Sequence, residues 1–139
     1  MRQQPTMFAR TKTVLYVMGL GILLCGCAAR TGTNTYNAQA QASPHAEPVC
    51  LLRAPLPSGI KHKVLGQVES SKQWYGGIEE ILVNMGNEAR RIGADAVVSM
   101  TAGQKMGFFA WARPVGVGMG VKLENRSDLN CVALGGEFR

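Results

Sequence analysis

A short apolar run that ends near a cysteine limits how much of this chain can fold. Three basic residues precede the run Val14–Leu24, and Cys27 follows it after two residues. The run has 11 residues, whereas a membrane-spanning helix needs about 20. A basic start, a brief apolar stretch and small residues at its end are typical of a secretory signal, which is absent from the mature protein. We therefore assign residues 1–26 to a signal peptide.

The residues Leu24-Cys25-Gly26-Cys27 resemble the signal of bacterial lipoproteins, in which the cysteine after Leu-x-Gly is lipidated and becomes the first mature residue. The resemblance implies that Cys27 carries a diacylglyceryl group and an N-acyl chain such as palmitate, and durable anchoring takes two or more chains. Ala28 stands where an aspartate would signal inner-membrane retention, so the resemblance implies the periplasmic face of the outer membrane. The alternative is an ordinary cleaved signal that releases a soluble product.

Length and charge bound the remaining chain. Removing the first 26 of 139 residues leaves 113, which is room for one small domain. Three of the 15 Lys and Arg residues leave with the signal and all nine acidic residues stay, so the mature chain carries a net charge of +3. This surplus fits an ordinary solvated domain as well as one that meets an anionic surface. No basic cluster is denser than Arg90-Arg91, so nucleic-acid binding is not expected.

The segment after the cysteine is polar and small. Between Ala28 and Glu47 the sequence has no Leu, Ile, Val, Met, Phe or Trp, so this part has little apolar surface to offset its ordering entropy. We expect residues 27–48 to be the lipidated cysteine and a flexible tether, and residues 49–139 to be the folded domain. A domain of that size gains from a cross-link or from self-association.

Two cysteines remain for such a cross-link once Cys27 is lipidated. Cys50 and Cys131 bracket nearly the whole domain, and a disulfide between them is the simplest account in an exported protein. It would close a loop of about 80 residues. The chain-entropy model predicts that such a bond stabilises the folded state by roughly 4 kcal/mol. The alternatives are two separate thiols, or a metal site with His45 or His62. Because the cysteines that remain after processing include no closely spaced pair, we expect no metal and no other cofactor.

Hydrophobic periodicity predicts an α+β domain with a small sheet and one long amphipathic helix packed on it, in the order β-β-α-β-β. In the predicted strand over residues 62–69, Val64 and Val68 are expected to lie on the same face of the sheet. The predicted elements are strands over 48–52, 62–69, 94–100 and 115–123 and a helix that begins after Gly77 and stops at Gly93.

The helix has the clearest pattern in the chain. Its apolar residues recur with a spacing of three and four, which builds one stripe for burial. Acidic residues lie in its first turn and basic residues in its last, as the helix dipole favours. The stripe consists of Ile78, Ile81, Leu82, Met85, Ala89 and Ile92, and the charged pairs are Glu79, Glu80 and Arg90, Arg91.

Aromatic residues and glycines crowd the last third of the chain. Phe108, Phe109 and Trp111 form either core or an exposed tip that touches lipid or a partner, and Trp74 and Tyr75 have the same two interpretations. The glycines of the last predicted strand share one face, which permits close approach by a helix, a ligand or another chain. A phosphate-binding loop is disfavoured because no helix follows. The glycines are Gly116, Gly118 and Gly120, and with the three aromatics they are the candidate partner or self-association surface.

The order of these elements resembles small domains of the YbjQ type, the so-called heavy-metal-binding family, and the related domain of the outer-membrane Rcs stress-sensor lipoprotein. The stretches Val64–Val68 and Arg91–Val98 carry most of the likeness, which covers about residues 60 to 123. It implies a compact sheet with one long helix. Because YbjQ-type members look like ring-forming homo-oligomers, the resemblance also implies self-association. The Rcs-type domain senses envelope damage and is stapled by two disulfides, which Cys50 and Cys131 alone cannot form.

We therefore expect a membrane-anchored periplasmic lipoprotein with a non-enzymatic binding domain for an envelope protein partner, in envelope-stress sensing or signalling. The alternatives are a self-associating structural module and a metal-binding module. An enzyme is not expected, because no nucleophile, base and oxyanion donor converge in the pattern. His45 and His62 are expected to be solvated, and Asp95 to cap the end of the helix.

Overall fold

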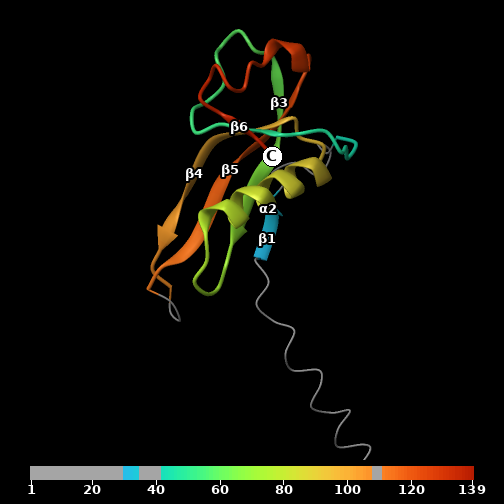
Figure 1. Cartoon of the computed structure of the whole chain (residues 1–139). Helices are drawn as coiled ribbons and strands as arrows, with labels where there is room; N and C mark the ends of the chain where they lie inside the picture. The colour runs from blue at the N-terminus through green and yellow to red at the C-terminus, as the bar shows by residue number, and fades with distance from the viewer. Residues whose placement is uncertain (1–29, 35–41, 108–110) are drawn as a thin grey trace, which may run out of the picture.

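The computed structural model describes residues 30–34, 42–107 and 111–139. One helix packs on a mixed sheet, so the predicted α+β class is confirmed. Figure 1 shows the strands fanned behind helix α2. The elements are β1 (Arg30–Asn34), β2 (Cys50–Leu51), β3 (His62–Ser71), α2 (Ile78–Arg91), β4 (Ala96–Lys105), β5 (Arg113–Leu123), the 3-10 turn η2 (Arg126–Asp128) and β6 (Glu137–Phe138).

The sheet has the strand order β1-β3-β5-β4-β2-β6. β5 lies between β3 and β4 and pairs antiparallel with both, whereas β2 pairs parallel with β4. The predicted order β-β-α-β-β is incomplete, because it lacks β1 and β6. Both additional strands are short and pair through backbone groups, which any side chain permits. Neither has the apolar alternation by which a strand is found in a sequence.

The segment expected to be a tether contributes to the fold. β1 pairs antiparallel with β3 at residues 30–34. Further on, the Ala42 N–H donates to the Ile92 carbonyl at 3.2 Å and the His45 N–H to the Arg90 carbonyl at 3.3 Å. Residues 42–48 therefore lie along the carboxyl end of α2. Backbone hydrogen bonds, which composition does not reveal, hold these polar residues against the domain.

A bulge corrects one prediction about β3. The register with β5 shifts between Val64 and Gly66, so the two valines of this strand do not share a face as expected. Val64 is 47% exposed, whereas Leu65 and Val68 are buried against the helix. An extra residue in one strand exchanges the faces of all residues that follow it.

Helix α2 confirms the predicted stripe. Its buried residues include Ile81, Leu82, Met85 and Ala89, with acidic residues in the first turn and basic residues in the last, as predicted. On its outer face Arg91 donates to Glu88, and this hydrogen bond, together with the charge of Glu88, raises the pKa of Arg91. Among the described residues, no helix has the length and apolar character that a membrane span requires.

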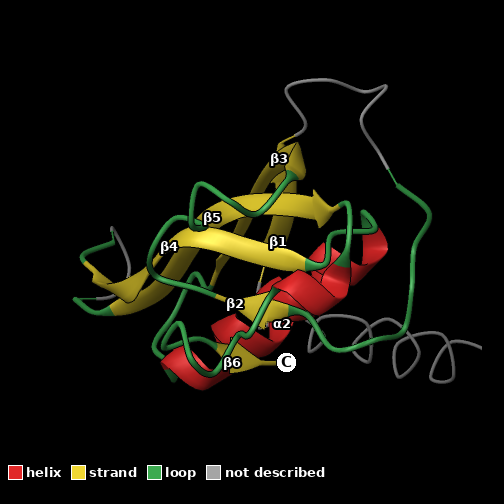
Figure 2. Cartoon of the chain, turned by 90° about the horizontal axis from the view of Figure 1, so that it is seen from above, coloured by secondary structure: helices red, strands yellow, loops and turns green. Residues whose placement is uncertain are grey.

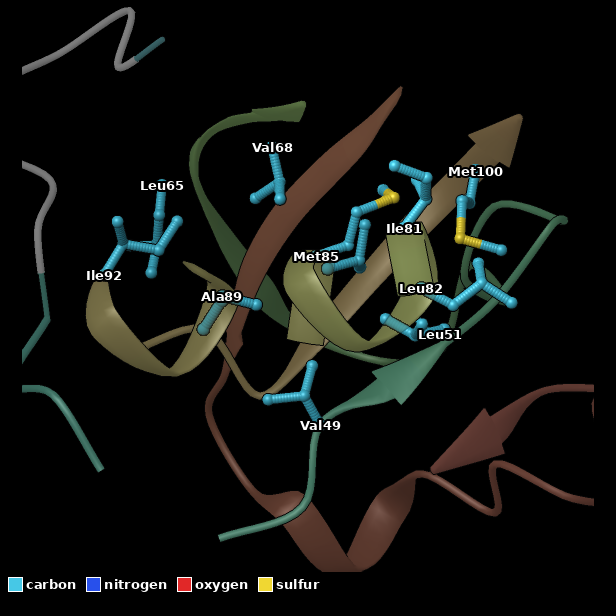
Figure 3. Packing of buried hydrophobic residues seen from close by; sticks show 12 residues of the cluster. Val49, Leu51, Leu65, Val68, Ile81, Leu82, Met85, Ala89, Ile92 and Met100 are labelled. Atoms are coloured by element: carbon cyan, nitrogen blue, oxygen red, sulfur yellow. The ribbon is translucent and has the colours of Figure 1, made fainter. Parts of the chain in front are cut away.

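Two apolar clusters lie on the two faces of the sheet. The larger lies between α2 and the sheet, and its side chains interdigitate in Figure 3. Figure 2 shows α2 lying across this face, with β2 and β6 beside it. The smaller cluster lies on the other face, under the loops after β2 and β5. It consists of Cys50, Leu52, Ala96, Val98, Val121 and Cys131, with Leu56, Met119 and Leu129 packed against it.

Candidate functional site

A disulfide closes the end of the sheet at which β4 begins and β5 ends. It joins Cys50 of β2 to Cys131, 81 residues later, as the sequence predicted. Both residues are buried. Their sulfur atoms are bonded to each other, which argues against the alternatives of separate thiols and of a thiolate metal site. Within the described ranges, no group of three His, Cys, Asp or Glu residues is placed to hold a metal ion.

Beside the disulfide, Asp95 is a nearly fully buried carboxylate. Its side chain is 1% exposed. Oδ2 accepts the backbone N–H of Leu123 at 2.9 Å, and Oδ1 accepts Lys122 Nζ at 2.9 Å. The Arg126 Nε lies 3.2 Å from the same Oδ1. A buried carboxylate is tolerated when charged donors compensate its lost hydration, and here two cations and a backbone amide do so.

Arg126 connects three segments at this point. Besides Asp95, its guanidinium donates to the Pro48 carbonyl at 2.9 Å and pairs with Glu47. The planar group has five donors in a fixed arrangement, which suits a residue that must satisfy several acceptors at once. It therefore holds η2 against the segment that leads into β2.

His45 belongs to the same cluster. Its side chain is 15% exposed, and Nε2 lies 2.8 Å from the Ala94 carbonyl and 3.7 Å from Asp95 Oδ1. Because a carbonyl oxygen only accepts, Nε2 must carry the proton. His45 is therefore not the solvated residue that its place in the sequence suggested. His62, in contrast, is exposed as expected, and its Nδ1 contacts the Ile60 carbonyl.

A cavity of about 440 Å³ opens next to this cluster. Its walls are mainly apolar, and its charged lining residues are those that Arg126 joins, Glu47 and Asp95, together with Arg126 itself. Such a combination of apolar walls and a few convergent polar groups is typical of ligand-binding pockets, and the volume lies in their usual range. The lining residues are Glu47, Pro48, Cys50, Asp95, Leu123, Arg126, Leu129 and Phe138.

The role of Asp95 differs from the one expected. It does not cap α2; its carboxylate instead binds β5 and η2. The partners lie 27 to 50 residues away in the sequence, so no local spacing could have assembled the cluster. The one available signal was the position of a charged residue within the apolar stretch Ala94–Met100. A charged residue in a buried strand requires partners.

The glycines of β5 lie inside the fold. Gly116, Gly118 and Gly120 are buried. A Cβ added at Gly116 would stand 2.8 Å from Ile81, and one at Gly120 would stand 3.0 Å from Ile92. Helix α2 thus covers this face, so the glycines do not form part of an exposed self-association surface. They allow close packing within the chain. They also lie within a strand, whereas the glycines of a phosphate-binding loop form a turn that leads into a helix.

For the aromatic residues, the sequence left two interpretations open, core or exposed tip, and the structure decides between them for three residues. Trp111 is 82% exposed, and Trp74 and Tyr75 are exposed as well, so these three are not core. Phe108 and Phe109 lie outside the described residues, as does Cys27, the predicted lipidation site.

No family model, curated protein or solved structure matches this chain.

Proposed function

We propose that this chain is a lipid-anchored lipoprotein on the periplasmic face of the outer membrane, whose domain binds an envelope protein without catalysing a reaction. The observation that carries the binding role is the cavity beside Asp95 and Arg126. The anchor rests on the sequence around Cys27, and the disulfide fits an oxidising compartment. The likeness to the Rcs-type lipoprotein favours envelope-stress sensing as the purpose of this binding.

The chemistry of the cavity supports binding more than catalysis. Both oxygens of Asp95 already accept hydrogen bonds or ion pairs, so this carboxylate is poorly placed to take a proton from a substrate. Among the described residues, the one cysteine that lines the cavity, Cys50, has its sulfur atom bonded to Cys131 in the disulfide. Its apolar walls, with Phe138 half exposed at the rim, suit an apolar side chain of a partner protein.

The self-associating module has less support. We expected self-association mainly because the glycines of one strand share a face, and α2 covers that face. The metal-binding module would need Cys50 and Cys131 as thiolate ligands, and these two residues form a disulfide instead. Neither alternative gains an observation of its own.

The first test is the intact mass and oligomeric state of the protein purified from native membranes. We expect a monomer in which Cys27 carries acyl chains and Cys50 and Cys131 have lost two hydrogens. An unlipidated product would contradict the anchor. A ring or dimer with reduced cysteines would favour the self-associating module instead.

The second test addresses the binding role. A photo-cross-linking residue in place of Phe138, at the rim of the cavity, should cross-link an envelope protein in native membranes. The matched control is the same group in place of Val83, which is 46% exposed on α2 and lies outside the cavity lining. Filling the cavity with Leu129→Trp should abolish the product at position 138. Persistence of the product in the filled variant would contradict binding at this site. Deletion of the gene without any change in the envelope-stress response would contradict the sensing role.

A further inference from the structure

The end of the sheet opposite the cavity has a different surface. The loop between β3 and α2 and the hairpin between β4 and β5 meet there, and β1 begins there, at the lower end of the coloured part of the chain in Figure 1. Among the residues that the structure describes at this end, four large apolar side chains are exposed: Trp74, Tyr75, Met106 and Trp111. We propose that this aromatic end, defined by these four residues, lies on the bilayer to which Cys27 is anchored. The inference rests on the proposed lipid anchor and adds an orientation and a second membrane contact.

The strand register places the start of β1 at the aromatic end. Arg30 pairs with Ser71, Ser71 pairs with Val115, and Val115 pairs with Gly103. These four residues therefore form one row across four strands. Because neighbouring strands lie about 4.8 Å apart, the row is about 14 Å wide. Beyond it, the β4–β5 hairpin continues through the pair Lys105 and Arg113 towards Trp111.

The length of chain between the row and the anchor is short. Cys27 precedes Arg30 by three residues, and three residues span at most about 11 Å even when fully extended. Acyl chains on Cys27 enter the bilayer at its surface. The aromatic end must therefore lie close to the headgroups, and this proximity favours lipid over a protein as the group that covers it.

The aromatic end is held together as one surface. The backbone N–H of Trp111 donates to the Tyr75 hydroxyl at 3.3 Å. Gln104 Nε2 donates to the Gly76 carbonyl at 3.2 Å, and the Lys72 N–H donates to the Pro114 carbonyl at 3.1 Å. These three bonds join the loop before α2 to the hairpin, so the aromatic side chains are presented from linked backbone segments.

The chemistry of this end suits a membrane interface. Tryptophan and tyrosine concentrate at the headgroup level of membranes, because one part of each ring system is apolar and another can hydrogen-bond. Trp111 and Met106 are 82% and 78% exposed, which leaves most of their apolar surface available. Lys105 faces Arg113 across the hairpin, and two adjacent cations favour an anionic headgroup.

Intrinsic fluorescence can test the contact directly. The chain has two tryptophans, Trp74 and Trp111, and both lie at the aromatic end. The experiment uses the full lipidated chain with Trp74→Phe, reconstituted into vesicles of phosphatidylethanolamine and phosphatidylglycerol. We expect brominated lipids to quench Trp111, and the quenching by aqueous iodide to fall several-fold relative to the unlipidated Cys27→Ser chain without vesicles. Met106→Ser should weaken the lipid quenching. Val132→Ser, a change at an exposed residue next to Cys131 at the disulfide end, should leave it unchanged.

Flotation of the vesicles and the mass of Cys27 measure the anchor separately. If the acylated chain floats with the vesicles while iodide still reaches Trp111, the orientation is wrong and the anchor stands. Protection from iodide without quenching by brominated lipid would mean that protein covers the aromatic end, which also overturns the proposal. A chain that is neither acylated nor floated overturns both the orientation and the proposed anchor.

Discussion

Gly116 of β5 lies directly beneath Met85 of α2, so closely that a Cβ built on the glycine would stand 2.5 Å from the methionine sulfur and 2.8 Å from Ile81. Real Cβ atoms do not approach other atoms that closely. Met85 and Ile81 are both fully buried, so neither can move aside into solvent. The distance between helix and sheet is therefore set by the absence of a side chain at this position.

Gly116→Ala should lower the free energy of unfolding by about 1–3 kcal/mol, because an overpacked core displaces side chains or backbone. The matched control is Gly103→Ala in the neighbouring strand, where an added Cβ meets nothing within 4 Å. That variant should be neutral or up to about 1 kcal/mol more stable, because alanine restricts the unfolded chain. Urea unfolding curves compare the two, and equal effects would contradict the packing described.

Gly93 should tolerate alanine less well than Gly135. Both have a left-handed backbone, with φ of +79° and +73°, which costs a non-glycine residue about 1–2 kcal/mol. An added Cβ at Gly93 would also stand 2.6 Å from the Ala42 backbone, whereas at Gly135 it meets nothing within 4 Å. Thermal unfolding of the two alanine variants measures the difference. Equal losses would show that residues around Ala42 do not pack on the end of α2.

Asp95→Asn should destabilise the domain by about 2–3 kcal/mol, because hydrogen bonds to charged groups are worth more than neutral ones and the carboxylate is buried. Lys122 and Arg126 would lose their shared partner, although both reach solvent in part. Asp128→Asn is the control, since Asp128 is exposed and bonds the side chain of Asn125. We expect that control to change the free energy of unfolding by less than about 0.5 kcal/mol. Similar losses in both variants would mean that the Asp95 cluster is not a structural centre.

Local patterns account for the parts of the fold that the sequence predicts. The stripe of α2 follows helical spacing, and its stop at Gly93 follows from a left-handed glycine, so both could be predicted. The bulge beside Gly66 could not, because one unpaired residue leaves the composition of the strand unchanged while it moves Val64 to the other face. β1 has no apolar alternation and depends on an edge that β3 provides.

The candidate site depends still more on distant contacts. Asp95 stands out in its segment as a charged residue within an apolar stretch, but His45 and Arg126 have no such signal. The three residues form a cluster only because the fold brings their segments together. The disulfide could be predicted because two cysteines remain once the expected signal and the expected lipidation of Cys27 are set aside, and this step needs no knowledge of the fold. The exposure of Trp111 could not, since an aromatic cluster in a small domain fits a core equally well.

The disulfide should supply a large share of the stability of this domain. Replacing both Cys50 and Cys131 by alanine should lower the free energy of unfolding by about 4 kcal/mol, because an 81-residue separation is no longer closed in the unfolded chain. Reductant should bring the unchanged protein to a similar value, measured by urea unfolding. The double variant is the control, because reductant has no bond to break there and should leave its curve unchanged. An oxidised protein no more stable than the double variant would mean that the loop is already restrained in the unfolded state.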